Sequence, residues 1–127
     1  MVAYNFIKQF ADDVAAGRKN FTIRERRKRH ARKGENVQVY TGMRTKSCRK
    51  LVDPDPVCER VAPIIIWRIN QHRCTIALDG NLLTRDQVDY LVTTDGFKSD
   101  KEFMAFHLGD LQTTSKIYIQ WGFWNAG

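Results

Sequence analysis

Apolar residues near the start of the chain recur at spacings of three and four, at Phe6, Ile7, Phe10 and Val14. This spacing predicts an amphipathic helix over residues 5–16. Gly17 stands where a helix commonly ends in a left-handed conformation. The period then changes to two over residues 20–24 and 36–40, which is typical of half-buried strands.

The second half of the chain continues this mixture of periods. Residues 57–69 are rich in β-branched side chains and predict a long strand, and residues 73–78 predict its hairpin partner. Thr84 and Ser99 each precede a Gln or Glu by three residues, a pattern that opens helices. Residues 116–124 predict a last strand. The pattern therefore predicts an α+β fold.

The length and composition of the chain predict one domain over residues 1–127. It is 43% hydrophobic, which suits a folded core. The first ten residues lack the continuous apolar core of a signal peptide, and the longest apolar run, residues 64–67, is far too short to span a membrane. Three cysteines without a CxxC pair predict reduced thiols and no metal site. We expect a cytoplasmic monomer without a cofactor or membrane contact.

The charge is distributed unevenly along the chain. The formal net charge is +7, but residues 18–50 hold 13 Lys and Arg against two acids. The remainder holds 8 Lys and Arg against 12 acids. Clustered cations gain free energy by releasing counterions from phosphates. The segment therefore favours a nucleic-acid partner, although a solvated basic loop would have the same composition.

The run Gly17-Arg18-Lys19-Asn20-Phe21-Thr22-Ile23-Arg24 resembles the G-x-K-x-x-T-I-R signature of ASCH domains. His30, Gly34 and the strand after them agree with that family in order. Asp95-Gly96-Phe97 before a Ser-capped helix is also similar to the family pattern. The resemblance covers most of the chain, and it extends to short ASCH proteins of bacteria and their phages.

This resemblance implies a PUA-like fold, a partly open β-barrel of about five to six strands flanked by helices. It also implies a cleft for RNA, for other single-stranded nucleic acid, or for a modified nucleoside. One branch of the family is similar to an amidohydrolase that deacetylates acetylcytidine with a Lys, a Thr and a Glu. Those positions fall on Lys19, Thr22 and Asp95, the last being one methylene shorter than Glu.

The residue types suit that chemistry. A threonine hydroxyl becomes a nucleophile when a nearby base takes its proton, and a neutral lysine can be that base. A carboxylate can orient or protonate the leaving nitrogen. Thr22 and Arg24 share one face of a strand, so the pair could equally hold a phosphate.

The leading hypothesis is nucleic-acid binding, with RNA as the partner expected from this family and RNA processing by a ribonuclease activity as an extension. The alternatives are the amidohydrolase and a protein-interaction module of phage origin. Tyr40 is either a base-stacking residue or core, and His107 is expected at a surface or helix end. The candidate nucleic-acid contacts are Arg18, Arg24, Arg26, Arg27, Lys28, Arg29, His30, Arg32, Tyr40, Arg44 and Lys46.

Overall fold

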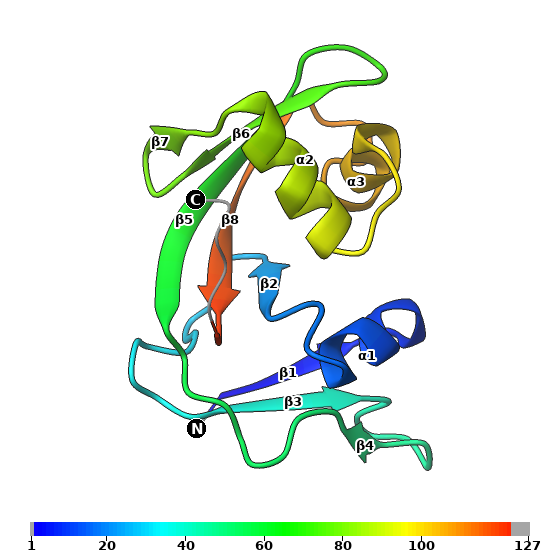
Figure 1. Ribbon diagram of the computed structural model, residues 1–127, viewed down its shortest axis with the longest axis vertical. Helices are drawn as coiled ribbons and strands as arrows, with labels where there is room; N and C mark the ends of the chain where they lie inside the picture. Colours follow the sequence, from blue (N-terminus) through cyan, green and yellow to red (C-terminus); the bar gives the residue numbers. More distant parts are fainter. Residues whose placement is uncertain (1, 123–127) are drawn as a thin grey trace. The chain divides into compact units, whose positions relative to one another are not determined.

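The computed structural model describes residues 2–122. Along the chain its elements are β1 (Val2–Phe6), α1 (Lys8–Ala15), β2 (Phe21–Arg24), β3 (Val37–Thr41), β4 (Arg49–Lys50), β5 (Arg60–Arg68), β6 (Cys74–Leu78), β7 (Asn81–Leu82), α2 (Arg85–Thr94), α3 (Asp100–His107) and β8 (Thr113–Gln120). Figure 1 shows them in sequence colours.

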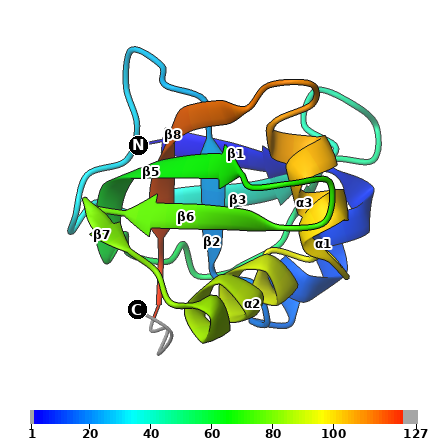
Figure 2. The ribbon, with the colours of Figure 1, turned by 90° about the horizontal axis from the view of Figure 1, so that it is seen from above.

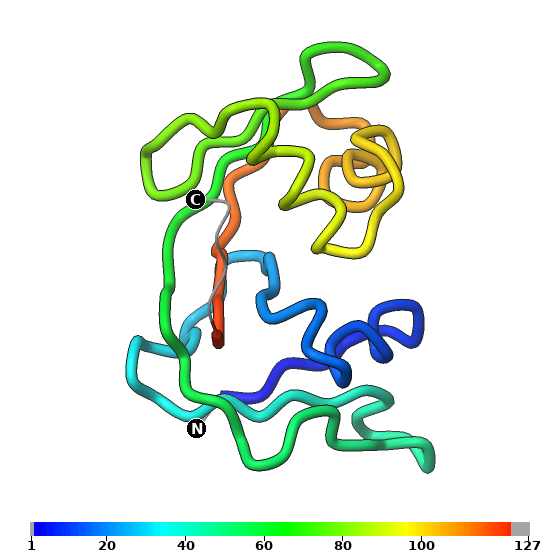
Figure 3. The backbone as a smooth tube through the Cα atoms, viewed as in Figure 1, coloured from blue at the N-terminus to red at the C-terminus, as the bar shows by residue number. Residues whose placement is uncertain are grey.

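The chain divides into two compact units. Of the described residues, unit 1 contains 2–21, 27–61 and 119–122, and unit 2 contains 22–26 and 62–118. The backbone passes from one unit to the other within β2, returns between Arg26 and Arg27, and passes again within β5 and within β8, as the tube in Figure 3 allows the reader to follow. Each unit is described below by itself.

Unit 1 is built on a three-stranded sheet in the order β1-β3-β4. Strands β1 and β3 run parallel and side by side, with Val2 opposite Val37 and Tyr4 opposite Val39 (Figure 1). All four of these side chains are buried, because alternate residues of a strand face the same side. Helix α1 packs on these two strands through Phe10.

The predicted helix over residues 5–16 is therefore wrong at its beginning. Residues 2–6 form a strand, and the helix begins at Lys8. Its end was predicted correctly, since Gly17 follows it with a φ of 80° and donates its N–H to the Val14 carbonyl. This left-handed geometry strains a residue with a Cβ but not glycine.

Unit 2 is built mainly from a five-stranded sheet in the order β2-β8-β5-β6-β7. The predicted hairpin is confirmed: β5 and β6 are antiparallel neighbours, with Ile64 opposite Leu78 and Ile66 opposite Ile76. Figure 2 shows the two strands running in opposite directions. All four side chains are buried and form the apolar face against which helices pack.

Both predicted helix starts in unit 2 are confirmed. The Thr84 hydroxyl accepts the Gln87 N–H, and the Gln87 side chain accepts the Thr84 N–H, which completes a capping box. The Ser99 hydroxyl accepts the Glu102 N–H in the same way. Helices α2 and α3 contact each other and β6.

The α+β class is confirmed. The described residues form three helices and eight strands in two sheets, more strands than the five to six predicted, because β1, β4 and β7 were not expected. The predicted last strand is β8, which begins at Thr113, and the predicted residues 123 and 124 lie outside the described range. Within residues 2–122 no helix has both the length and the apolar character needed to cross a bilayer.

Candidate functional site

The formal excess of positive charge belongs to unit 1. Its residues include 13 Lys and Arg and six Asp and Glu, whereas unit 2 contains eight of each kind. Unit 1 therefore holds the whole net charge of +7, and unit 2 is formally neutral. The sequence showed the cationic segment, but it did not show that Arg24 and Arg26 belong to a different unit from the other basic residues.

Tyr4 organises the first basic loop of unit 1, residues 27–36. Its hydroxyl accepts the Ala31 N–H at 3.1 Å and lies 2.9 Å from Nδ1 of His30, whose ring stacks on the tyrosine ring. The Arg27 guanidinium lies over the same ring at 4.7 Å from its centroid. Tyr4 is itself buried, so a core residue holds a loop that the sequence predicts to be irregular. The alternation of Val2, Tyr4 and Phe6 was the available signal for this residue.

Glu35 engages part of the loop's charge. Its carboxylate pairs with Arg29 and accepts the backbone N–H of Arg32 at 3.0 Å. The hydrogen bond from Arg29 is the main reason that the pKa of Glu35 lies below its ordinary value, and the Arg32 N–H adds to it. At the end of α1, Arg18 is paired with Asp13 at 2.8 Å. Arg18 and Arg29 are thus exposed cations that already have carboxylate partners.

The second basic segment of unit 1, residues 42–50, surrounds the short strand β4. Lys50 pairs with Asp55 at 2.6 Å, and that hydrogen bond raises the pKa of the lysine. Its Nζ lies 5.9 Å from the ring centroid of Tyr40, which is half-buried. Tyr40 is therefore neither fully core nor fully open, and its proposed stacking on a base stays a prediction.

Six cations in the two basic segments of unit 1, residues 27–36 and 42–50, are exposed and have no ion pair or side-chain hydrogen bond within residues 2–122. We call them the open cations, and they come from the loop after β2, from the segment between β3 and β4, and from β4 itself. They are Lys28, Arg32, Lys33, Arg44, Lys46 and Arg49.

Lys19, the lysine of the ASCH-like signature, is buried in unit 1 at 3% exposure. Its Nζ lies 4.7 Å from the ring centroid of Phe21 and 5.2 Å from that of Phe10. A third ring, that of Phe6, is 5.9 Å away. Aromatic faces attract an ammonium group through the ring quadrupole, which partly offsets the loss of hydration.

Thr22 and Arg24 lie in unit 2 and contact each other as neighbours on one strand face. The Nε of Arg24 donates to the Thr22 hydroxyl at 2.7 Å, and Thr22 is 3% exposed. A guanidinium stays protonated in proteins, so this partner positions the hydroxyl but does not take its proton. Arg26, the next cation along the chain, donates to Ser115 at 3.2 Å and is exposed.

Asp95 is the end of a buried polar chain in unit 2. Its Oδ2 accepts a hydrogen bond from Nε2 of His107 at 2.8 Å, and Nδ1 of that histidine lies 3.5 Å from Nζ of Lys116. The lysine in turn pairs with the exposed carboxylate of Glu25 at 3.2 Å. His107 is the last residue of α3, so of the two expected places it occupies the helix end, and it is buried there, with Phe97 edge-on against its ring. Lys116 was not recognised from the sequence, because it lies at an ordinary polar position of a strand.

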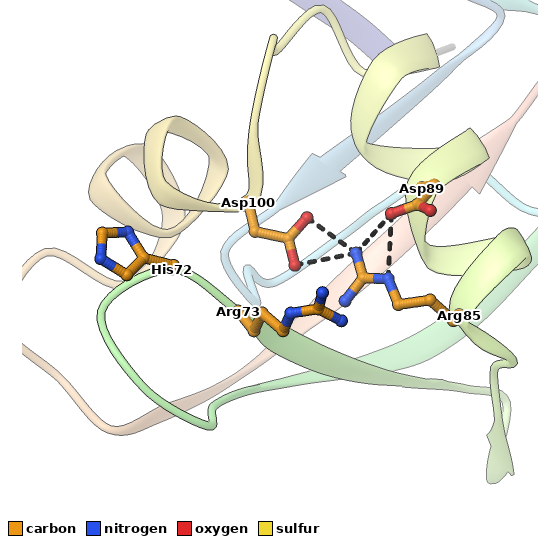
Figure 4. A pocket seen from close by; sticks show the side chains of 5 residues that line it. All are labelled: His72, Arg73, Arg85, Asp89 and Asp100. Carbon is orange, nitrogen blue, oxygen red and sulfur yellow. Dashed lines mark hydrogen bonds and ion pairs between the residues drawn. The ribbon is translucent and has the colours of Figure 1, made fainter.

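A small polar pocket of about 240 Å³ opens elsewhere on unit 2. Figure 4 shows the Arg85 guanidinium placed between the carboxylates of Asp89 and Asp100, with Arg73 beside it. The His72 ring points away from this group in the same view. Because both carboxylates are turned toward Arg85, the pocket is built around internal ion pairs.

No protein-family model, curated protein or solved structure matches the chain.

Proposed function

We propose that the protein binds single-stranded nucleic acid, RNA in particular, through the open cations of unit 1. The observation that carries the proposal is that unit 1 holds the whole net charge of +7, and that the six open cations of its two basic segments have no ion pair or side-chain hydrogen bond among residues 2–122. Cations concentrated in this way repel one another, which costs folding free energy unless a polyanion offsets the repulsion. The choice of RNA, an ASCH identity and a PUA-like barrel come from the resemblance of residues 17–24.

The mechanism that we infer is mainly electrostatic. Each phosphate neutralised on a single strand releases condensed counterions, so the logarithm of affinity falls with the logarithm of salt concentration by about 0.7 per phosphate. If Lys28, Arg32 and Lys33 each neutralise one phosphate, their loss lowers the magnitude of that slope by about 2. Arg27 stacked on Tyr4 and the Arg29–Glu35 pair hold the loop in place.

Fluorescence anisotropy with labelled single-stranded RNA, single-stranded DNA and duplex DNA tests this function. We expect binding of RNA that weakens by at least tenfold between about 50 and 200 mM salt. The variant in which Lys28, Arg32 and Lys33 are all replaced by alanine should lose most of this affinity and show the smaller slope.

A matched control removes two lysines and one arginine from unit 2, where Arg73, Lys98 and Lys101 are exposed. Their replacement by alanine lowers the net charge by the same amount and should leave most of the affinity intact. Equal losses of affinity in the two triple variants would mean that binding depends only on the overall charge of the protein. Binding that does not respond to salt, or no binding to any of the three nucleic acids, would overturn the proposal.

A second function, amide hydrolysis on a modified nucleoside, is favoured by a different observation. Lys19, Thr22 and Asp95 are each only 3% exposed, and they are three of the seven buried polar or charged residues in the described part of the chain. Burying a polar group is costly, so three such residues in the signature positions point to a role beyond solubility.

In the reaction that the resemblance implies, a threonine hydroxyl oxygen attacks the acetyl carbonyl while a neutral lysine takes the hydroxyl proton, and Thr22 and Lys19 are the residues at those two signature positions. The C–N bond then breaks, the cytidine nitrogen receives a proton, and water hydrolyses the acetyl-threonine ester. Asp95 would orient the leaving nitrogen. The test is incubation with N4-acetylcytidine and chromatographic detection of cytidine. Cytidine release by the wild type that is lost in both Lys19→Ala and Thr22→Ala supports the reaction. If the wild type releases cytidine no faster than those variants, this function is wrong.

A further inference from the structure

Unit 1 contains a cavity of about 710 Å³ between the beginning of α1 and the segment that joins β3 to β4. The segment 42–48 and the first turn of α1 follow β3 and β1, which are adjacent parallel strands, so both leave the sheet at the same edge (Figure 1). The volume lies within the range of roughly 300–1,000 Å³ that is typical of small-molecule sites. Of the open cations, Arg49 lines this cavity and the other five do not.

The walls of the cavity are held by hydrogen bonds within unit 1. The Asn5 side chain accepts the Met43 N–H at 3.0 Å, and the Thr41 hydroxyl donates to the Phe6 carbonyl at 2.7 Å. The Thr45 hydroxyl donates to the Gly42 carbonyl at 2.6 Å and closes a tight turn. The cavity is thus preformed, which lowers the entropy cost of binding a ligand.

Gly42 makes the turn of this wall possible. Its φ is 64°, and a Cβ at this position would lie 2.8 Å from the Ser47 carbonyl oxygen. A side chain here would therefore force the backbone of the 42–48 segment to move. Gly42 therefore shapes one side of the cavity.

The lining combines an apolar part with a cationic part. The apolar part includes Ile7 from the beginning of α1, which is 48% exposed, and Met43 from the segment after β3. Lys8 and Arg49 are the two cations of the lining, and Ser47 contributes a hydroxyl group to it. Neither cation has an ion pair within the part of the chain that the structure describes.

The beginning of α1 adds to the positive potential of the cavity. Ile7 occupies the N-cap and offers no oxygen to the first N–H groups of the helix, and the first turn contains no acidic residue. Uncapped N–H groups and the positive end of the helix dipole both favour an anion. Asp12, one turn further along, is the one acid in the lining.

We propose that this cavity is a subsite for one nucleotide unit, with the base against Ile7 and Met43 and the phosphate at Lys8, Arg49 and Ser47. A planar base suits an apolar wall because it can be buried without losing hydrogen bonds at its edges, and a phosphate suits the two cations. The inference rests on the proposed nucleic-acid function, since it names the place where one nucleotide of the bound strand is held.

The test follows amide resonances of the full-length, 15N-labelled chain during titration with AMP, GMP, CMP and UMP. Parallel titrations use the nucleosides and inorganic phosphate alone. We expect at least one monophosphate to shift the resonances of residues 5–12 and 41–49, with an affinity at least tenfold above that of its nucleoside and of phosphate. Arg49→Ala should weaken this binding at least tenfold.

Arg32→Ala is the matched control, because it removes the same charge from unit 1 at a residue outside the cavity lining. It should weaken mononucleotide binding less than twofold while lowering affinity for a long RNA. Monophosphates that leave these resonances unchanged, or bind no better than phosphate, overturn the subsite even if long RNA binds. Shifts of these resonances by a monophosphate without any binding of long RNA would support the subsite and overturn the proposed function.

Discussion

Replacing Asp100 by asparagine should destabilise unit 2 strongly, because one buried carboxylate joins the starts of three elements. Asp100 opens α3, and its two oxygens accept hydrogen bonds from Arg85, the first residue of α2, at 2.8 and 2.9 Å. One of these oxygens also accepts the backbone N–H of Cys74, the first residue of β6, at 3.1 Å. Asp100 is 8% exposed, and Figure 4 shows its carboxylate facing Arg85.

The magnitude follows from what asparagine can still do. Its carbonyl keeps one acceptor, but its NH2 group would face an N–H donor, and the negative charge opposite Arg85 is lost. Breaking a fully buried ion pair costs roughly 3–5 kcal/mol. The Arg85 side chain is 36% exposed, so water compensates in part, and we expect about 2–3 kcal/mol. Asp89 pairs with the same guanidinium but is 58% exposed, so Asp89→Asn should cost about 0.5 kcal/mol or less.

Urea unfolding at pH 7, followed by far-ultraviolet circular dichroism, measures both variants against the wild type. A loss of about 2–3 kcal/mol is a large fraction of the stability of a small protein, so the midpoint should fall clearly for Asp100→Asn. The slope of the free energy against urea should not change, because the same surface is exposed on unfolding. If Asp100→Asn costs no more than Asp89→Asn, the carboxylate does not join these elements as described.

Three further outcomes are expected. Burial, with a further contribution from Asp100, raises the pKa of Cys74 from 9.0 to about 12. The stability that this thiol contributes is therefore complete below pH 9 and is lost as pH rises toward 12. Between about pH 8 and 10.5 the wild type should lose more stability than Cys74→Ala, and equal losses would contradict this. His107→Phe removes the hydrogen bond of 2.8 Å to the buried Asp95 carboxylate and should lower the free energy of unfolding in urea by about 2–4 kcal/mol. A loss below about 1 kcal/mol would mean that this hydrogen bond contributes little. Gly42→Ala should lower the midpoint of thermal unfolding more than Gly80→Ala. Both glycines have a positive φ, but only a Cβ at residue 42 would lie 2.8 Å from a carbonyl oxygen. Similar shifts of the midpoint would argue against a tight turn at Gly42.

The predicted features that the structure confirms depend on neighbouring residues. The side chains of Thr84 and Gln87 each accept the other residue's backbone N–H and cap α2, and Gly17 ends α1 with a positive φ. The hairpin of β5 and β6 joins segments that are close in the chain. Such features involve interactions over a few residues, so the sequence contains all the information that is needed to predict them.

The beginning of the chain shows where this reasoning fails. Phe6, Ile7 and Phe10 have helical spacing, but Val2, Tyr4 and Phe6 also alternate, and the two patterns overlap at Phe6. The strand forms because β1 pairs in parallel with β3, about 35 residues further along the chain. Parallel partners are distant in sequence, so no local pattern identifies them.

The candidate sites divide in the same way. The sequence alone showed that the cations cluster, and that residues 17–24, with Lys19 and Thr22, resemble an ASCH signature. Only the tertiary structure decided that His107 and Lys116 extend a buried chain from Asp95, and that Lys8 and Arg49 line one cavity. A residue type states which interactions are possible, but burial and hydrogen-bond partners depend on segments that folding brings together from distant parts of the chain.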